Sequence, residues 1–134
     1  MNKIVPIFFA CDDGFVKFTI VTMKSIMENA DKNQTYKFYV LNTNISQKYI
    51  DLTNEVVKEY HNFSVEFEDV SGYLDAVSDR LPLRDYYSKT TYFRLFIAEM
   101  HPELDKAIYI DSDTIVKGDI FKLYSNDLGN NLVG

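Results

Sequence analysis

The apolar segment from Ile4 to Cys11, with the sequence IVPIFFAC, decides how the rest of the chain is interpreted. It has the length of a strand, shows no alternation of polar and apolar residues, and is followed at once by Asp12-Asp13. A continuous apolar run of this kind is typical of a strand that is covered on both faces, as in a parallel sheet. We therefore expect this segment to be a central strand.

Helices and strands are predicted to alternate after this segment. Apolar residues from Val16 to Met27 recur at helical spacing, residues 36–41 predict a second strand, and residues 63–70 alternate as in a half-exposed strand. Ser46 is expected to cap a helix between these two strands. The apolar face of that helix comprises Tyr49, Leu52, Val56 and Tyr60. The order β-α-β-α-β predicts an α/β fold with a mainly parallel sheet flanked by helices.

The second half of the chain is less regular. Residues 71–90 predict a short helix and then an irregular segment, and Tyr92 to Met100 predicts a helix that stops before His101-Pro102. Ala107 to Ile110 predicts another buried strand, and residues 114–117 predict an extended segment. The chain ends in what resembles the start of a further strand. We expect residues 1–134 to be a single domain and the front part of a longer protein.

Composition excludes several classes of function. The 134 residues correspond to about one domain, and their formal net charge of −6 offers no basic surface for nucleic acid or anionic lipid. No apolar stretch approaches the roughly 20 residues of a membrane span. The first eleven residues resemble a short secretory signal, but Pro6 and the following Asp12-Asp13 are atypical of one. With Cys11 as the single cysteine, a cytoplasmic location is expected, with the inner face of the membrane as an alternative.

Two acidic clusters follow expected strands. Asp12-Asp13 comes after the first strand, and Asp111-Ser112-Asp113 comes after the strand at residues 107–110. Open α/β sheets bind ligands at the carboxyl ends of their strands, and clustered carboxylates suit Mg²⁺ or Mn²⁺. The Asp-x-Asp triplet is weak by itself, because 13 aspartates in this chain produce about one such pair by chance. The alternative is that these aspartates only form hydrogen bonds in turns.

The neighbours of the triplet make it more specific. The segment from Ala107 to Val116 (AIYIDSDTIV) resembles the strand and metal motif of nucleotide-sugar glycosyltransferases, most closely family eight. This retaining GT-A group includes lipopolysaccharide galactosyl- and glucosyltransferases and glycogenins. Further similar motifs are Ala10 to Phe15 (ACDDGF), Thr90 to Leu95 (TTYFRL) and Asp127 to Gly129 (DLG). The resemblance covers residues 4–134 and implies the N-terminal part of a Rossmann-like GT-A nucleotide-diphospho-sugar transferase fold.

The same resemblance implies roles for particular residues. Asp111 and Asp113 would hold Mn²⁺, or Mg²⁺, against the diphosphate of a UDP-sugar. Asp12 would hydrogen-bond the uracil edge, Phe15 would stack on the base, and Arg94 would reach the donor. The implied nucleotide-sugar-binding positions are Ala10, Asp12, Asp13, Phe15, Arg94, Asp111 and Ser112. The chain departs from the family pattern at Gly14, where a polar residue is usual, and it lacks the part that carries the family's metal-binding histidine.

The resemblance implies metal-dependent transfer of a hexose, glucose or galactose, from a UDP-sugar to a saccharide or lipopolysaccharide acceptor with retention. No catalytic residue is identified. One alternative is a non-catalytic nucleotide-sugar-binding fragment, whose exposed sheet edge would favour a homo-oligomer. Another is a response-regulator receiver domain with Asp69 as the phospho-acceptor.

The remaining candidate residues have ordinary explanations. His61 and His101 are expected in surface or capping positions, and Cys11 is expected to pack within its strand. Arg94 has an alternative role in an ion pair on a helix surface. The aromatic residues expected to be functional are Phe15, Tyr86 and Tyr87.

Overall fold

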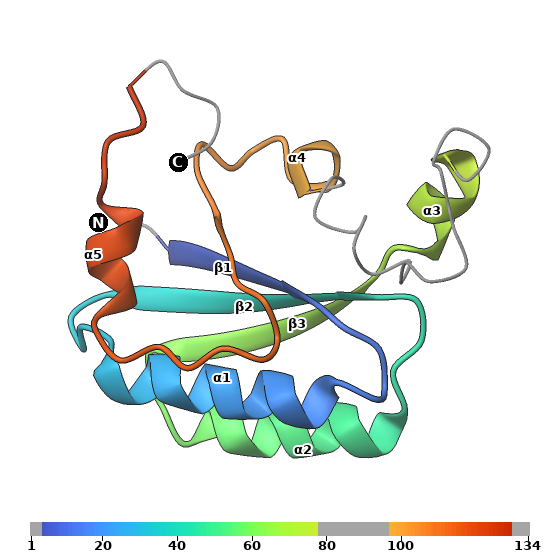
Figure 1. Ribbon diagram of the computed structural model, residues 1–134, viewed down its shortest axis with the longest axis horizontal. Helices are drawn as coiled ribbons and strands as arrows, with labels where there is room; N and C mark the ends of the chain where they lie inside the picture. Colours follow the sequence, from blue (N-terminus) through green and yellow to red (C-terminus); the bar gives the residue numbers. More distant parts are fainter. Residues whose placement is uncertain (1–3, 78–96, 130–134) are drawn as a thin grey trace.

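Four parallel strands form the sheet of this protein, in the order β3-β2-β1-β4 (Figure 1). The structure is a computed structural model and describes residues 4–77 and 97–129. The strands are β1 (Ile4–Ala10), β2 (Thr35–Asn42), β3 (Phe63–Asp69) and β4 (Ile108–Tyr109). The helices are α1 (Val16–Asn29), α2 (Gln47–Lys58), α3 (Ser71–Val77), α4 (Ile97–Met100) and α5 (Ile120–Tyr124).

The strand β1 is central, as its uninterrupted apolar sequence predicts. It pairs with β2 along its whole length and with β4 at Ile7 and Phe8. Ile7, Phe8 and Phe9 have no exposed surface. Successive side chains of a strand point to opposite faces, so both faces of the sheet must be covered for all three to be buried.

Two apolar clusters cover these faces. Ile7 and Phe9 belong to a large cluster that includes Met23 and Ile26 of α1 and Val57 of α2. The two helices lie side by side against this face of the sheet (Figure 1). Phe8 belongs to a smaller cluster on the opposite face, where Tyr39 stacks on its ring at 4.5 Å. Residues of α4 and of the connection to β4 pack against that second cluster.

The predicted elements of the first half are present. The helix α1, the strands β2 and β3 and the helix α2 lie where the periodicity of the sequence places them, and α3 matches the short helix expected after β3. In the second half, α4 covers only the end of the helix predicted over residues 92–100, and its first part lies outside the described residues. The strand start expected at residues 132–134 also lies outside them.

Two details of α2 differ from the prediction. Leu52 was expected on the apolar face, but 42% of its surface is exposed, whereas Thr53 and Val57 are buried. The hydroxyl of Thr53 donates to the carbonyl of Tyr49 at 2.7 Å, and this internal hydrogen bond lets a polar residue take the buried position. Ser46 precedes the helix as expected, but its side chain makes no capping hydrogen bond.

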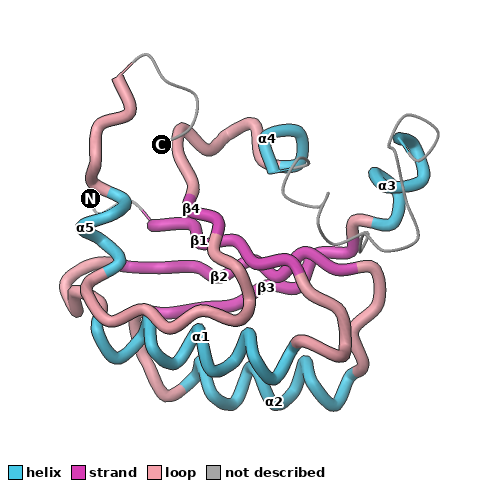
Figure 2. Tube along the Cα trace, in the orientation of Figure 1, coloured by secondary structure: helices cyan, strands magenta, loops and turns pink. Residues whose placement is uncertain are grey.

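The segment at residues 114–117 is not part of the sheet. It was predicted to be extended, and within the described part of the chain it belongs to no strand. After β4 the chain crosses the sheet edge and runs beside α1 before reaching α5 (Figure 2). No described helix is long and apolar enough to cross a membrane.

Replacement of two apolar residues of α2 tests the corrected orientation of this helix. Val57→Ala should lower the free energy of unfolding by about 2 kcal/mol, because it removes two buried carbons and leaves a cavity. Leu52→Ala removes a larger but exposed group and should change it by no more than about 0.5 kcal/mol. Urea unfolding of both variants measures the difference, and a larger loss for Leu52→Ala would show that the orientation of α2 is wrong.

Candidate active site

The two acidic loops lie at the carboxyl ends of neighbouring strands. β1 and β4 are parallel, and the amide of Ile110 donates to the carbonyl of Phe8 at 3.0 Å just beyond the paired residues. The next residues along each strand are therefore brought to the same edge of the sheet. The Ser112 hydroxyl donates to the carbonyl of Ala10 at 3.1 Å and joins the two loops directly. Ala10 and Ser112 thus form the contact around which the site is built.

The first acidic loop is held by its own carboxylates. Oδ1 of Asp12 accepts the amide of Gly14 at 3.0 Å, and Oδ1 of Asp13 accepts the amide of Ser46 at 2.8 Å. The second bond fixes the start of α2 to the loop after β1, although the sequence predicted capping by the Ser46 side chain. A side chain at position 14 would approach Oδ1 of Asp12 to 3.3 Å, so glycine suits this tight turn. Asp13 therefore has a structural partner in the fold.

The second acidic loop leaves its carboxylates open. Asp111 and Asp113 are exposed, and the Thr114 hydroxyl donates to the backbone carbonyl of Asp111 at 3.1 Å. Within residues 4–77 and 97–129 neither carboxylate has a hydrogen-bond or ion-pair partner. Asp119, nearby in sequence, instead has a structural role, because its Oδ1 accepts hydrogen bonds from the amides of Phe121 and Asp31 at 3.0 Å each.

The donor chemistry of Asp111 and Asp113 fits a hard cation. Two exposed carboxylates supply oxygen ligands, which Mg²⁺ and Mn²⁺ prefer, and such ions keep water or phosphate oxygens in their remaining positions. In the described part of the chain, no three side chains of His, Cys, Asp or Glu gather as a metal-binding group. The described residues thus offer two ligands of an open coordination shell.

An exposed pair of aromatic rings borders the site. Phe15 is the N-cap residue of α1 and is 51% exposed, and Phe18 is 45% exposed with its ring centre 6.1 Å from that of Phe15. Phe15 was expected to be functional and Phe18 was not, although their separation of three residues places them on one side of a helix. Arg94, Tyr86 and Tyr87 lie outside the described residues.

Cys11 packs in the interior, as expected. It is buried, and its amide donates to the carbonyl of Leu41 at 3.2 Å, which extends the pairing of β1 with β2. Burial raises the pKa of the thiol to about 11, and the nearby charges of Asp12 and Asp13 add to this effect. Cys11 is therefore a structural residue and not a nucleophile.

His101 was expected in a surface or capping position; it directly follows α4, where its amide donates to the carbonyl of Ile97, but its side chain is not on the surface. Its ring packs edge-on against Phe8 and Tyr39, and only 11% of its side chain is exposed. Nε2 lies 2.6 Å from Oε1 of Glu68, and Nδ1 lies 2.9 Å from Oε1 of Glu103. Burial lowers the pKa of His101, but the two carboxylates outweigh it, so that the pKa is raised. No sequence pattern marks this contact, because Glu68 is distant along the chain and faces His101 only once the sheet has formed.

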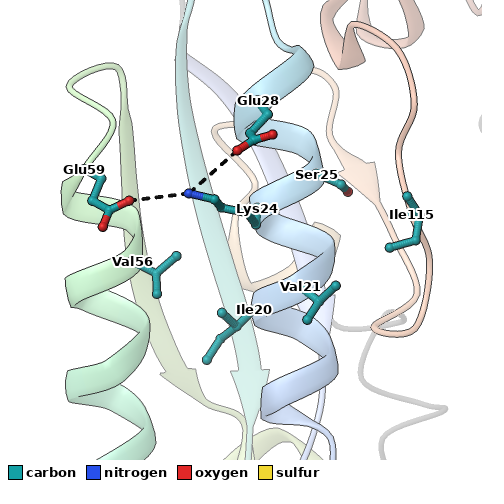
Figure 3. A pocket seen from close by; sticks show the side chains of 8 residues that line it. All are labelled: Ile20, Val21, Lys24, Ser25, Glu28, Val56, Glu59 and Ile115. Carbon is teal, nitrogen blue, oxygen red and sulfur yellow. Dashed lines mark hydrogen bonds and ion pairs between the residues drawn. The ribbon is translucent and has the colours of Figure 1, made fainter.

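A surface pocket of about 480 Å³ lies apart from the strand ends, between α1, α2 and Ile115. Lys24 spans it and forms ion pairs with Glu59, just after α2, at 3.4 Å and with Glu28 at 3.8 Å (Figure 3). Its apolar lining comes from Ile20, Val21, Val56 and Ile115, of which Val21 and Ile115 are more than half exposed.

Comparison with known proteins identifies the family. Residues 6–134 match Glycosyl transferase family 8. The chain belongs to this family. Its relatives include the glycosyltransferase GlyE of Streptococcus pneumoniae, which is 30% identical over 124 residues, 92% of this chain and 29% of GlyE. A putative glycosyltransferase of Haemophilus influenzae is 28% identical over 130 residues, 96% of this chain and 38% of that protein.

Solved structures agree with this family 8 assignment. The bifunctional glycosyltransferase WbbM is 32% identical and has a TM-score of 0.84, with 98% of this chain and 22% of WbbM covered. The galactosyltransferase LgtC, solved with donor and acceptor sugar analogues, is 27% identical with a TM-score of 0.69, and 93% of this chain and 44% of LgtC are covered. These proteins are GT-A glycosyltransferases, which confirms the predicted fold. The chain spans less than half of each of these relatives.

The receiver-domain alternative is wrong for this family 8 chain. In the flavodoxin-like order 2-1-3-4-5 the first and third strands are neighbours, whereas β2 separates β1 from β3 here. Asp69 ends the edge strand β3 and accepts hydrogen bonds from the hydroxyl and amide of Ser71, at 2.5 and 2.8 Å. These hydrogen bonds lower the pKa of Asp69. It thus closes a turn two strands away from Asp12 and Asp13.

The contacts of His101 predict a pH-dependent stability. Because its pKa in the folded state is raised above the ordinary 6.5, its ion pairs stabilise the fold fully below about pH 6.5 and are lost as the pH rises through the folded-state pKa. The difference in unfolding free energy between the wild type and His101→Gln should therefore fall over that range. Urea unfolding at a series of pH values measures it. His61→Gln, at an exposed position, is the control, and a difference that rises with pH would contradict the prediction.

Proposed function

We propose that this chain supplies the donor-binding part of a glycosyltransferase that transfers a hexose, glucose or galactose, from a UDP-sugar with retention. The proposed acceptor is a saccharide or a lipopolysaccharide. Membership of family 8 supports glycosyl transfer, and the solved complex of the galactosyltransferase LgtC with donor and acceptor sugar analogues supports a sugar donor and a sugar acceptor. Since the chain spans 29% of GlyE, donor binding is assigned to this chain and transfer to the whole protein.

The contact between Ser112 and Ala10 is the observation that carries the proposal. It holds the loop after β4 against the loop after β1, so that groups suited to a diphosphate and groups suited to a base lie at one edge of the sheet. Asp111 and Asp113 belong to the first of these loops, and Asp12 and Phe15 belong to the second. A nucleotide diphosphate carries both a base and a diphosphate in one molecule.

In this proposal Mn²⁺, or Mg²⁺ in its place, binds to Asp111 and Asp113. Their carboxylates are exposed and have no partner among the described residues, so binding would not require them to leave another contact. The bound ion would act as a Lewis acid and offset the charge that develops on the departing diphosphate. The other ligands would come from water, from the donor and from parts of the protein beyond the described residues.

The base-binding side of the proposed site uses the loop after β1. Gly14 occupies Oδ1 of Asp12, which leaves Oδ2 to accept a hydrogen bond from the uracil edge. The exposed ring of Phe15 offers a face on which the base can stack. Asp13 would act by positioning, since its carboxylate holds the amide of Ser46. Arg94 remains a predicted donor contact outside the described residues, and a cytoplasmic location and self-association also remain predictions.

Calorimetric titration of UDP into this chain tests the metal site. Binding should be saturable with Mn²⁺ present and lost when a chelator is added. Asp111→Asn should weaken Mn²⁺-dependent binding by about 100-fold or more, because even changes beyond the direct ligands of a metal typically cost 10–100-fold. The matched control is Asp51→Asn, at an exposed aspartate of α2, which should bind as the wild type does. Equal binding by Asp111→Asn and the wild type would refute the proposed metal ligands.

Replacement of Phe15 tests the base-binding side. Phe15→Ala should weaken UDP binding by about 5- to 100-fold, the range expected when one stacked ring is removed. The same titration measures it, with Val21→Ala, at an exposed apolar position of α1, as the control. If the two variants bind UDP equally well, Phe15 does not contact the base.

A further inference from the structure

The segment that follows the Asp-x-Asp triplet is attached to α1 by side chains. Residues 112–116 belong to no described strand, yet the carbonyls of Ser112, Thr114 and Val116 all accept hydrogen bonds from α1. The donors are Thr22 and Asn29, and between them Ser25 accepts the amide of Val116. We call Thr22, Ser25 and Asn29 the polar row. Their spacing of three and four residues places them on one side of the helix.

Thr22 makes the contact nearest to the triplet. Its side chain is fully buried, and its hydroxyl lies 2.6 Å from the carbonyl of Thr114 and 2.9 Å from that of Ser112. The carbonyl of Phe18, on its own helix, is farther away at 3.2 Å. A hydroxyl has one proton, so it donates to one of these carbonyls at a time. Residues 112 and 114 flank Asp113, and the Thr22 hydroxyl therefore lies within hydrogen-bond distance of the backbone on both sides of that carboxylate.

Ser25 and Asn29 extend the attachment. The Ser25 oxygen accepts the amide of Val116 at 2.9 Å while its proton goes to the carbonyl of Thr22 at 2.7 Å. The amide nitrogen of Asn29 donates to the carbonyl of Val116 at 3.0 Å. Ser25 must both donate and accept, which a hydroxyl can do. Ser25 and Ile115 lie on facing sides of the pocket, as expected if the segment runs along the helix there (Figure 3).

We propose that the polar row of α1 positions Asp111 and Asp113 for metal and donor binding. The contacts with Thr22 fix the backbone around Asp113, and the Thr114 hydroxyl closes the turn on the carbonyl of Asp111. The inference rests on the proposed function, in which these carboxylates bind the ion. Thr22, Ser25 and Asn29 are positioning residues, since they act through the backbone of residues 112–116.

Amide exchange in the metal-free chain tests the attachment independently of any ligand. Ser25→Ala removes the acceptor of the Val116 amide, and hydrogen exchange followed by NMR should show that amide exchanging at least about tenfold faster. The amides of β2 serve as the internal reference for global stability. Unchanged protection of Val116 relative to β2 would overturn the inference.

Binding of UDP with Mn²⁺ tests the positioning. Thr22→Val keeps the shape of the side chain and removes the hydroxyl, and it should weaken Mn²⁺-dependent binding about 5- to 50-fold, whereas Thr22→Ser should restore it. The matched control is Thr53→Val in α2, where the hydroxyl is equally buried and bonds only to its own helix. A general loss of stability would affect both valine variants, but loss of positioning affects Thr22→Val alone.

The outcomes separate the inference from the proposed function. One outcome would overturn the inference alone. In it, the wild type binds UDP with Mn²⁺, Asp111→Asn does not, and Thr22→Val binds as well as Thr53→Val. Absence of Mn²⁺-dependent binding in the wild type would overturn the proposed function and the inference together. If Thr22→Val does not fold, Ser25→Ala takes its place in the titration, and unchanged affinity in that variant overturns the inference.

Discussion

Burial of β1 on both faces is the constraint on which the rest of this structure depends. Ile7, Phe8 and Phe9 are consecutive and fully buried, which requires a layer above the sheet, a layer below it and a strand on each side. The chain meets this requirement with α1 and α2 on one face and with the α4 region on the other. The neighbouring strand β4 is drawn from more than 90 residues later in the sequence, so the same constraint brings the two acidic loops together.

The polar residues that follow the strands are explained by this arrangement. A strand covered on both faces must leave the core at its end, and the chain there has to turn back into a helix. Asp12 and Asp13 meet that need with carboxylates that accept backbone amides. The loop after β4 has to pass α1 to reach α5, and it finds polar side chains on that helix. The candidate site lies where the loop after β1 and the loop after β4 meet.

Much of the fold could be predicted from the sequence, because its signals are local. An unbroken apolar run identified β1, and helical periodicity located α1 and α2. Errors arose where a tertiary contact decides the outcome. Leu52 is exposed because Thr53 can be buried once its hydroxyl bonds to Tyr49. His101 is held between Glu68 and Glu103, and the first of these reaches it only across the sheet.

For the candidate site, the sequence identified where carboxylates occur. It did not identify which of them already accept hydrogen bonds within the fold. A motif shows that carboxylates are present after β1 and β4. It does not show which of them the fold already uses, because that depends on where backbone amides point. Thr22, Ser25 and Asn29 were missed for a related reason. They read as ordinary polar positions of a helix, and their partners are backbone atoms, which carry no sequence signal.

The aspartates of this chain show how attachment to α1 leaves two of them open. In most loops of the described part, an aspartate accepts the amide two residues later and so stabilises its own turn. This is the case for Asp12, Asp31, Asp69, Asp119 and Asp127. The turn at Asp111 to Asp113 has another source of stability, since α1 and the Thr114 hydroxyl bind its backbone. Its carboxylates are therefore not needed to hold the turn, and a loop secured from outside can leave two negative charges exposed at one place.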